Sequence, residues 1–182
     1  GDVLIGLASS GLHSNGYSLA RKVCVEGKSA EDLLAPVDAL GGQSVGEALL
    51  TPTRIYVKQV LSVLAECPQA VRALAHITGG GITENLNRAL NAQVNAQVDL
   101  GTWPVPAIAK YVCEAADLSE GQALKTFNMG VGMVLIVDPE RACEVEAALA
   151  KAGETTYRVG RIVAGAGEVE YTGEGNLYDF RG

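Results

Sequence analysis

The chain lacks several features that would place it in a common class of protein. No apolar run in its 182 residues approaches the ~20 that a membrane-spanning helix needs. The opening GDVLIGLASSG has neither the basic region nor the cleavage site of a signal peptide. Only 19% of the residues are charged and 48% are hydrophobic, which excludes a disordered tail. No methionine opens the chain, so we expect it to begin inside a longer protein.

Positive charge is also scarce. The chain has 14 lysines and arginines against 21 acidic residues, a net charge of −7. General nucleic-acid binding needs a basic face, so we expect no nucleic acid among the partners, and no membrane. A local phosphate site remains compatible with this charge, because backbone N–H groups bind phosphate without net positive charge.

Cysteine and histidine are too few and too scattered for the common metal and redox motifs. The four cysteines have no C-x-x-C spacing and lie in segments predicted to be helical, which favours reduced thiols in a core: Cys24, Cys67, Cys113 and Cys143. With two histidines, no H-E-x-x-H and no paired acids, the sequence predicts neither a metal site nor a hydrolytic triad.

Two partial nucleotide-binding motifs are also incomplete. Gly27-Lys28-Ser29 ends like a P-loop, but position 22 is lysine instead of glycine. Gly130-x-Gly132 lacks the third glycine of a dinucleotide-binding loop and precedes a strand instead of a helix.

The hydrophobic pattern predicts one αβ domain with a mixed sheet over residues 1–172, followed by a loosely held tail at 173–182. Strands are predicted at 3–8, 73–77, 94–98, 131–137 and 155–163, with an edge strand at 168–171. One helix is predicted after the loop at 9–16, a second begins at Pro52 and has a wide buried face, and a third follows the glycines at 79–81. Further helices are predicted at 107–116, at 121–126 and after Asp138-Pro139. Residues 131–163 indicate a βαβ unit, and residues 26–50 an irregular connection with a short helical piece.

Glycine, at 22 residues, is abundant, and it is clustered. The first cluster is SSGLHSNG at 9–16, where hydroxyl, amide and imidazole groups sit between a strand and a helix. This pattern is typical of a loop that binds an anion or a sugar. The alternative is a tight strand–helix turn in which Ser14 or Asn15 caps the helix.

The second cluster, HITGGGITEN at 76–85, contains three consecutive glycines. Glycine loses more conformational entropy on folding than any other residue does, so a run of three needs a reason. We expect a ligand or another backbone to come very close to it. We favour phosphate or phosphosugar binding over a packing role, because a helix begins at the same place.

The third cluster, FNMGVGM at 127–133, leads into a strand and makes Asn128 a candidate ligand-binding residue. The alternative is a bulge or a close crossing of strands. His13 and His76 both lie in glycine-rich loops, although a lone histidine is more often a structural hydrogen-bonding group than a base.

Four segments stand together in an informative order: GDVLIGLASSGLHSNGYSLAR, LLTPTRIYVK, AHITGGGITENLNR and KTFNMGVGM. From Gly1 to about Val163 the chain resembles the C-terminal domain of the aminoimidazole ribonucleotide synthetases, or phosphoribosylformylglycinamidine cyclo-ligases. The superfamily also holds formylglycinamidine ribonucleotide synthetase, selenide water dikinase, thiamine monophosphate kinase and a hydrogenase maturation factor. The resemblance implies a single α+β domain: a three-layer α/β/α arrangement with a mixed sheet, partly ferredoxin-like.

The resemblance also implies an activity. It is the ATP-dependent ligation of purine biosynthesis that converts formylglycinamidine ribonucleotide to aminoimidazole ribonucleotide through an iminophosphate. ATP and Mg²⁺ would be bound mainly by an N-terminal domain outside this sequence, in a cytoplasmic homodimer. The present domain would form one wall of the cleft between the two domains and would be inactive alone. Two alternatives are a domain of another superfamily member and a non-catalytic phosphometabolite-binding module.

The matching positions imply two sets of binding residues. One set would contact phosphate or ribose: Thr78, Gly79, Gly80 and Gly81. The other set would line the same cleft: Ser10, Gly11, His13, Ser14 and Asn15. Arg88 and Asn128 are further candidates for binding, and His76 is a candidate for proton transfer. The family pattern has proline before the arginine, where this chain has Asn87.

Overall fold

A six-stranded mixed sheet forms the centre of the computed structural model, which describes residues 1–173. Residues 174–182, with almost all of the predicted tail, lie outside the described residues. The strand order is β2-β4-β1-β5-β3-β6, and neighbours are antiparallel except for β3 and β6. The strands lie within two residues of the predicted ones: β1 Val3–Ala8, β2 Val71–His76, β3 Val94–Asp99, β4 Val131–Val137, β5 Thr156–Ala164 and β6 Val169–Thr172.

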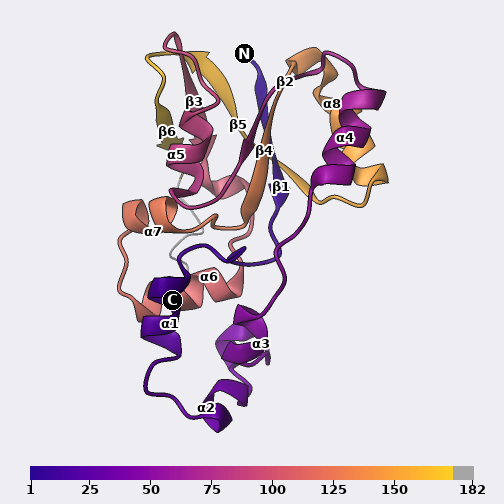
Figure 1. The fold of residues 1–182 in the computed structure, drawn as a ribbon. Helices are drawn as coiled ribbons and strands as arrows, with labels where there is room; N and C mark the ends of the chain where they lie inside the picture. The colour runs from indigo at the N-terminus through magenta and orange to yellow at the C-terminus, as the bar shows by residue number, and fades with distance from the viewer. Residues whose placement is uncertain (174–182) are drawn as a thin grey trace.

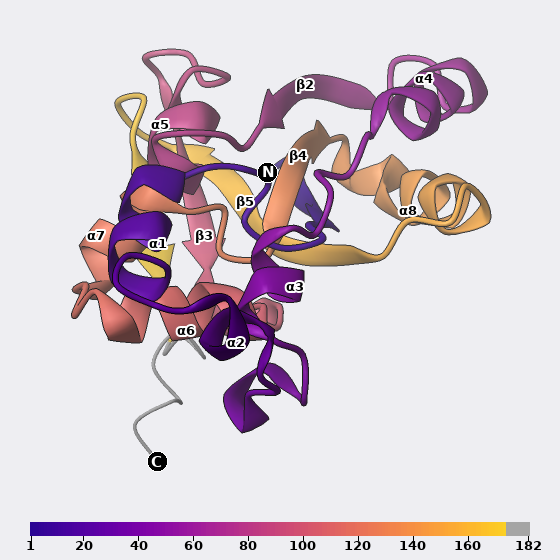
Figure 2. The same cartoon turned by 60° about the horizontal axis from the view of Figure 1, so that its bottom comes forward.

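Helices cover both faces of the sheet, as the predicted three-layer arrangement requires. Figures 1 and 2 show α4 and α8 together on one face and α5 on the other, while α1, α2, α3, α6 and α7 gather beyond one end of the strands. The helices are α1 Tyr17–Cys24, α2 Ala30–Leu34, α3 Val45–Leu49, α4 Val57–Glu66, α5 Gly81–Asn87, α6 Ala107–Ala115, α7 Glu120–Thr126 and α8 Ala142–Lys151. No helix in residues 1–173 has the length and apolar character needed to cross a membrane.

The predicted βαβ unit is confirmed as β4–α8–β5, with β1 inserted between its two strands. Both strands pair antiparallel with β1, so they run parallel to each other. The local sequence accounts for the helical connection. The Asp138 carboxylate accepts a hydrogen bond from the Glu140 amide at 3.0 Å, and Pro139 occupies the first turn.

Alternation along the strands divides the interior into two cores, one on each side of the sheet. On β1, Leu4 belongs to the core shared with α1, α5, α6 and α7, while Ile5 and Leu7 belong to the core beneath α4 and α8. Successive side chains of a strand point to opposite faces, which places both cores around one sheet.

Helix α4 differs from its prediction in two respects. It begins at Val57 instead of Pro52, and only part of its wide apolar face is buried. Val60 and Val63 face the sheet, whereas Val57 and Leu61 are 61% and 60% exposed. Because β2 is the last strand of the sheet, no further strand lies beneath the outer side of α4.

Two smaller expectations also change. The connection at 26–50 holds two five-residue helices, each started by a capping box: Ser29 with Asp32, and Ser44 with Glu47. Of the four cysteines, Cys143 is exposed instead of being part of a core.

Candidate functional site

The three glycine clusters meet at one end of the sheet. In the order β2-β4-β1, the two outer strands run opposite to β4, so the ends of β1 and β2 lie beside the start of β4. We name the segments that follow or precede them the serine loop (residues 9–16), the glycine loop (78–81) and the asparagine loop (127–130). Segments more than a hundred residues apart in sequence are thereby placed next to one another.

Phe127 of the asparagine loop packs against both other loops. The side chain is fully buried, and a Cβ added at Gly16 would collide with its ring. A Cβ at Gly81 would collide with the backbone carbonyls of Leu124 and Phe127. Gly16 and Gly81 have φ values of +66° and +60°, so both are required by close approach and by backbone conformation. At Gly81, close approach of another backbone is therefore one reason for the glycine run.

The other two glycines of the glycine loop have a different environment. A Cβ at Gly79 would meet no atom within 4 Å, and at Gly80, where φ is +95°, the atoms nearest an added Cβ belong to the Glu84 side chain. Within residues 1–173 the backbone N–H groups of Gly79 and Gly80 have no hydrogen-bond partner. Unpaired amides on an exposed, sterically open loop are suited to binding an anion.

Asn85, a residue that the sequence analysis did not select, organises the glycine loop. Its Nδ2 donates to the carbonyls of Thr78, Gly79 and Gly81 at 3.3, 3.1 and 2.8 Å, and its Oδ1 accepts from the Thr78 hydroxyl at 3.2 Å. The Asn85 side chain is buried, so these carbonyls are satisfied inside the protein. The amides are consequently the groups left available to a ligand.

His13 organises the serine loop as a hydrogen-bond acceptor. Its Nε2 accepts from the backbone amides of Ser10 at 2.9 Å and Arg54 at 3.4 Å, so Nε2 carries no proton and Nδ1 does. Burial, with smaller contributions from His76 and Arg54, lowers the pKa of His13 to about 4. The Nδ1–H group is buried and has no partner among the described residues.

Asn128 joins the asparagine loop to the serine loop. Its Oδ1 accepts from the Ser9 hydroxyl at 3.0 Å and from the Gly130 amide at 2.8 Å, while its Nδ2 donates to the Gly11 carbonyl at 2.8 Å. The side chain is fully buried. In this structure Asn128 therefore positions the loops, and its predicted contact with a ligand stays a prediction.

The alternative interpretations of two clusters are also settled by geometry. The residue that caps α1 is Gly16, without a side-chain cap, so neither Ser14 nor Asn15 takes the role considered for them. At the third cluster, a Cβ on Gly132 would collide with Tyr56 and His13, and the register of β1 against β4 shifts at Leu7/Ala8. The irregular register fits the bulge considered there, whereas the close contacts at Gly132 are with side chains and not with a crossing strand.

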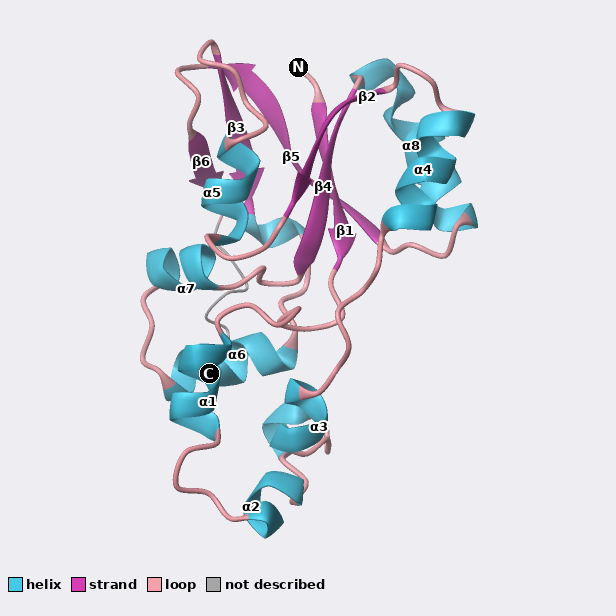
Figure 3. Cartoon of the chain, in the orientation of Figure 1, coloured by secondary structure: helices cyan, strands magenta, loops and turns pink. Residues whose placement is uncertain are grey.

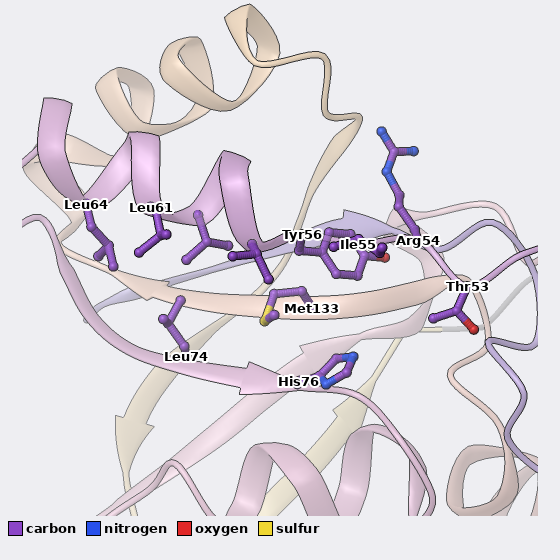
Figure 4. Close-up of a pocket in the computed structure, with 11 residues that line it drawn as sticks. Thr53, Arg54, Ile55, Tyr56, Leu61, Leu64, Leu74, His76 and Met133 are labelled. Atoms are coloured by element: carbon purple, nitrogen blue, oxygen red, sulfur yellow. The ribbon is translucent and has the colours of Figure 1, made fainter.

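A groove of about 470 Å³ lies beside these loops, between α4 and the edge strand β2 (Figure 4). His76 stands at the end nearest the glycine loop, and its ring meets that of Tyr56 edge to face at a centroid distance of 6.5 Å. The remaining lining residues are mostly apolar: Thr53, Arg54, Ile55, Val57, Val60, Leu61, Leu64, Leu74 and Met133.

The structure thus brings together most of the predicted site residues, with different degrees of access. Ser10, Ser14, His76 and Gly79 are exposed at this end of the sheet, with Asn15, Thr78 and Gly80 half-buried. Gly11 and Gly81, like His13 and Asn128, are buried.

Arg88 lies apart from the other candidates. It follows the last turn of α5, about 10 Å along the helix axis from Gly81. There it is exposed and lies 3.9 Å from the Glu84 carboxylate. Across residues 1–173, no three His, Cys, Asp or Glu side chains gather closely enough to hold a metal ion.

Comparison with known sequences identifies relatives over almost the whole chain. Residues 1–172 match the family model described as AIR synthase related protein, C-terminal domain. The phosphoribosylformylglycinamidine cyclo-ligase of Brevibacillus brevis is 53% identical over 173 residues, 95% of this chain and 49% of that protein. The enzyme of the same name from Limosilactobacillus fermentum is 47% identical over 163 residues, 90% of this chain and 46% of that protein. The chain therefore spans about half the length of the curated relatives it matches.

Solved structures have the same architecture. Protein tt0281 from Thermus thermophilus aligns with a TM-score of 0.58 and 26% identity, over 94% of this chain and 49% of that one. Two further structures share the fold. Thiamine-monophosphate kinase from Stenotrophomonas maltophilia aligns with a TM-score of 0.61 and 20% identity, over 96% of this chain and 51% of that one. HypE from E. coli aligns with a TM-score of 0.56 and 22% identity, over 94% of this chain and 46% of that one. The family match, the close relatives and the fold agree: this chain belongs to the family of AIR synthase related protein C-terminal domains.

Proposed function

We propose that the chain forms the substrate-side wall of the active cleft in an ATP-dependent cyclo-ligase that converts formylglycinamidine ribonucleotide to aminoimidazole ribonucleotide. The relatives named phosphoribosylformylglycinamidine cyclo-ligase support this assignment. We also infer a cytoplasmic enzyme that acts as a homodimer, as expected for the family.

The single observation that carries the proposal is the pair of unpaired amides at Gly79 and Gly80. Asn85 donates hydrogen bonds to the carbonyls of Thr78, Gly79 and Gly81, so the loop is already ordered in a form that presents N–H groups. The phosphate of a ribonucleotide would accept hydrogen bonds from these groups, and the Thr78 backbone would extend the contact. The exposed hydroxyls of Ser10 and Ser14 would face the ribose from the serine loop.

The chemistry requires positioning more than it requires reactive side chains. An amide oxygen leaves poorly, and phosphorylation converts it to phosphate, which departs when the neighbouring nitrogen attacks and closes the ring. Bound ATP with Mg²⁺ would supply the phosphoryl group. We assign the binding of ATP and Mg²⁺ mainly to the other half of such an enzyme, as the family resemblance implies.

His76 is the residue of this chain placed to take up a proton during ring closure. It is exposed at the end of the groove, two positions before the first residue of the glycine loop. Its imidazole would receive the proton released by the attacking nitrogen, provided that the substrate phosphate is held at Gly79 and Gly80.

The test is Gly79→Ala in the complete enzyme that carries this domain. The added methyl group meets no protein atom, and position 79 has no positive φ, so the fold should be unaffected. We expect the KM for formylglycinamidine ribonucleotide to rise about tenfold, which corresponds to about 1.4 kcal/mol of binding energy. The matched control is Gly121→Ala near the start of α7, an equally open position outside the three loops, which should leave KM unchanged. A wild-type KM in Gly79→Ala would contradict the proposal.

A further inference from the structure

Glu154, at the turn between α8 and β5, is a buried carboxylate that the proposed function does not use. Its side chain is 0% exposed. Neither carboxylate oxygen accepts a well-aligned hydrogen bond from the described residues, and the Nε of Arg54 lies 3.1 Å from Oε2. Burial raises the pKa of Glu154, and Arg54 opposes that rise. A buried carboxylate is costly unless a cation faces it, so the position of Arg54 is closely tied to Glu154.

Arg54 belongs to an extended segment, residues 51–56, that runs from α3 to α4 (Figure 3). We call this segment the strap. No backbone amide of the strap donates to a backbone carbonyl in the described part of the chain. Side-chain contacts must therefore hold the strap in place, and the Arg54 guanidinium is one of them: besides facing Glu154, its Nη2 donates to the Gly153 carbonyl at 3.0 Å.

The strap in turn holds the serine loop. The Ser10 hydroxyl donates to the Pro52 carbonyl at 2.7 Å, and the Arg54 amide donates to Nε2 of His13 at 3.4 Å. The Ser14 and Thr53 hydroxyls lie 3.5 Å apart. Arg54 thus connects two regions: its side chain reaches the α8–β5 turn, while its backbone amide reaches the serine loop.

We propose that Glu154 is a positioning residue for the substrate site: acting through Arg54, it holds the strap and so sets the position of Ser10, His13 and Ser14. This inference rests on the proposed function, because it assumes that the serine loop meets the ribonucleotide. A role confined to stability would lower the midpoint of unfolding without a selective effect on one substrate.

The experiment compares Glu154→Gln with Glu146→Gln in the complete enzyme. Glu146 supplies the control, because it is a half-buried carboxylate of α8 that pairs with Arg158 at 2.7 Å and makes no ion pair or hydrogen bond with the strap. For Glu154→Gln we expect a five- to tenfold rise in the KM for formylglycinamidine ribonucleotide, a kcat within about twofold of wild type, and an unchanged KM for ATP. Hydrogen exchange measured by mass spectrometry should accelerate in peptides covering 9–16, where the backbone amides of Ser9, Ser10 and Asn15 are hydrogen-bonded. Glu146→Gln should change none of these quantities.

Two outcomes would overturn the inference. One is unchanged exchange in 9–16. The other is faster exchange there with an unchanged KM, in an enzyme whose Gly79→Ala variant does raise KM. If Gly79→Ala also leaves KM unchanged, the proposed function has failed instead. Should Glu154→Gln fail to fold, Arg54→Lys is the second variant: it keeps a cation beside Glu154 but loses the bond to Gly153, and a smaller rise in the same KM is expected.

Discussion

The glycine loop and the serine loop form neighbouring parts of one site but are ordered in different ways. The glycine loop depends on one side chain of the helix that follows it, Asn85, which binds three of its carbonyls. The serine loop contains an acceptor of its own, His13, and is also held by Asn128 on one side and by the strap on the other. The glycine loop is therefore ordered by a near neighbour in sequence and can present bare amides, whereas the serine loop also depends on distant segments for its shape.

Of the substitutions that test this comparison, Gly81→Ala is expected to lower the stability of the chain most. The new Cβ would collide with the Leu124 carbonyl at a residue whose φ is positive, and backbone cannot move aside as a side chain can. We expect a loss of about 4 kcal/mol or more in the free energy of unfolding, measured by urea denaturation. Gly79→Ala, two residues away, should not destabilise the chain. Equal effects at the two positions would show that the glycine loop is not divided as described.

The serine loop has a pH dependence that the glycine loop lacks. The pKa of His13 is lowered to about 4 in the folded chain, so between pH 6.5 and 4 the unfolded chain binds the proton that the folded chain excludes. This contribution to stability is fully present above pH 6.5 and declines as the pH falls, by up to about 3 kcal/mol. Urea unfolding of wild type and His13→Gln across this range checks the prediction. A variant with the same slope as wild type would rule out His13 as the cause.

Removing the Asn85 or the Asn128 side chain should affect one loop and leave the other unchanged. Asn85→Ala and Asn128→Ala each leave buried carbonyl or amide groups without partners, at a cost of about 2 kcal/mol in stability. Hydrogen exchange should then increase at the Gly81 amide, which donates to the Thr78 carbonyl, for Asn85→Ala, and in 9–16 for Asn128→Ala. Faster exchange in both loops from a single substitution would mean that one of these side chains orders both loops.

The smallest effect on stability is expected at the exposed surface of the serine loop. The Ser14 hydroxyl is solvent-accessible, and its nearest polar contact, with Thr53, is 3.5 Å long. Ser14→Ala should change the free energy of unfolding by less than about 0.5 kcal/mol. Any rise in KM for the ribonucleotide in this variant would then report a contact with the ligand, and a destabilised variant would contradict the geometry.

Helices α4 and α8 indicate where prediction from sequence succeeds and where it fails. The helical turn that leads into α8 is encoded locally, because Asp138 caps the 3-10 turn Pro139–Arg141 and Pro139 opens that turn. Pro52 is equally compatible with a first turn, yet the helix begins at Val57, since the Pro52 carbonyl and the Arg54 amide are engaged by the serine loop. The partners are about forty residues away in sequence, and no local pattern reveals them.

The sequence by itself determined the strands, most of the helices and the three glycine clusters, because periodicity, caps and glycine conformations are properties of adjacent residues. Only the tertiary structure decided that the clusters share one sheet end, that Asn85 satisfies the glycine-loop carbonyls, and that Glu154 faces Arg54. Those relations depend on strand order and on burial, which arise when segments distant in the chain exclude water together.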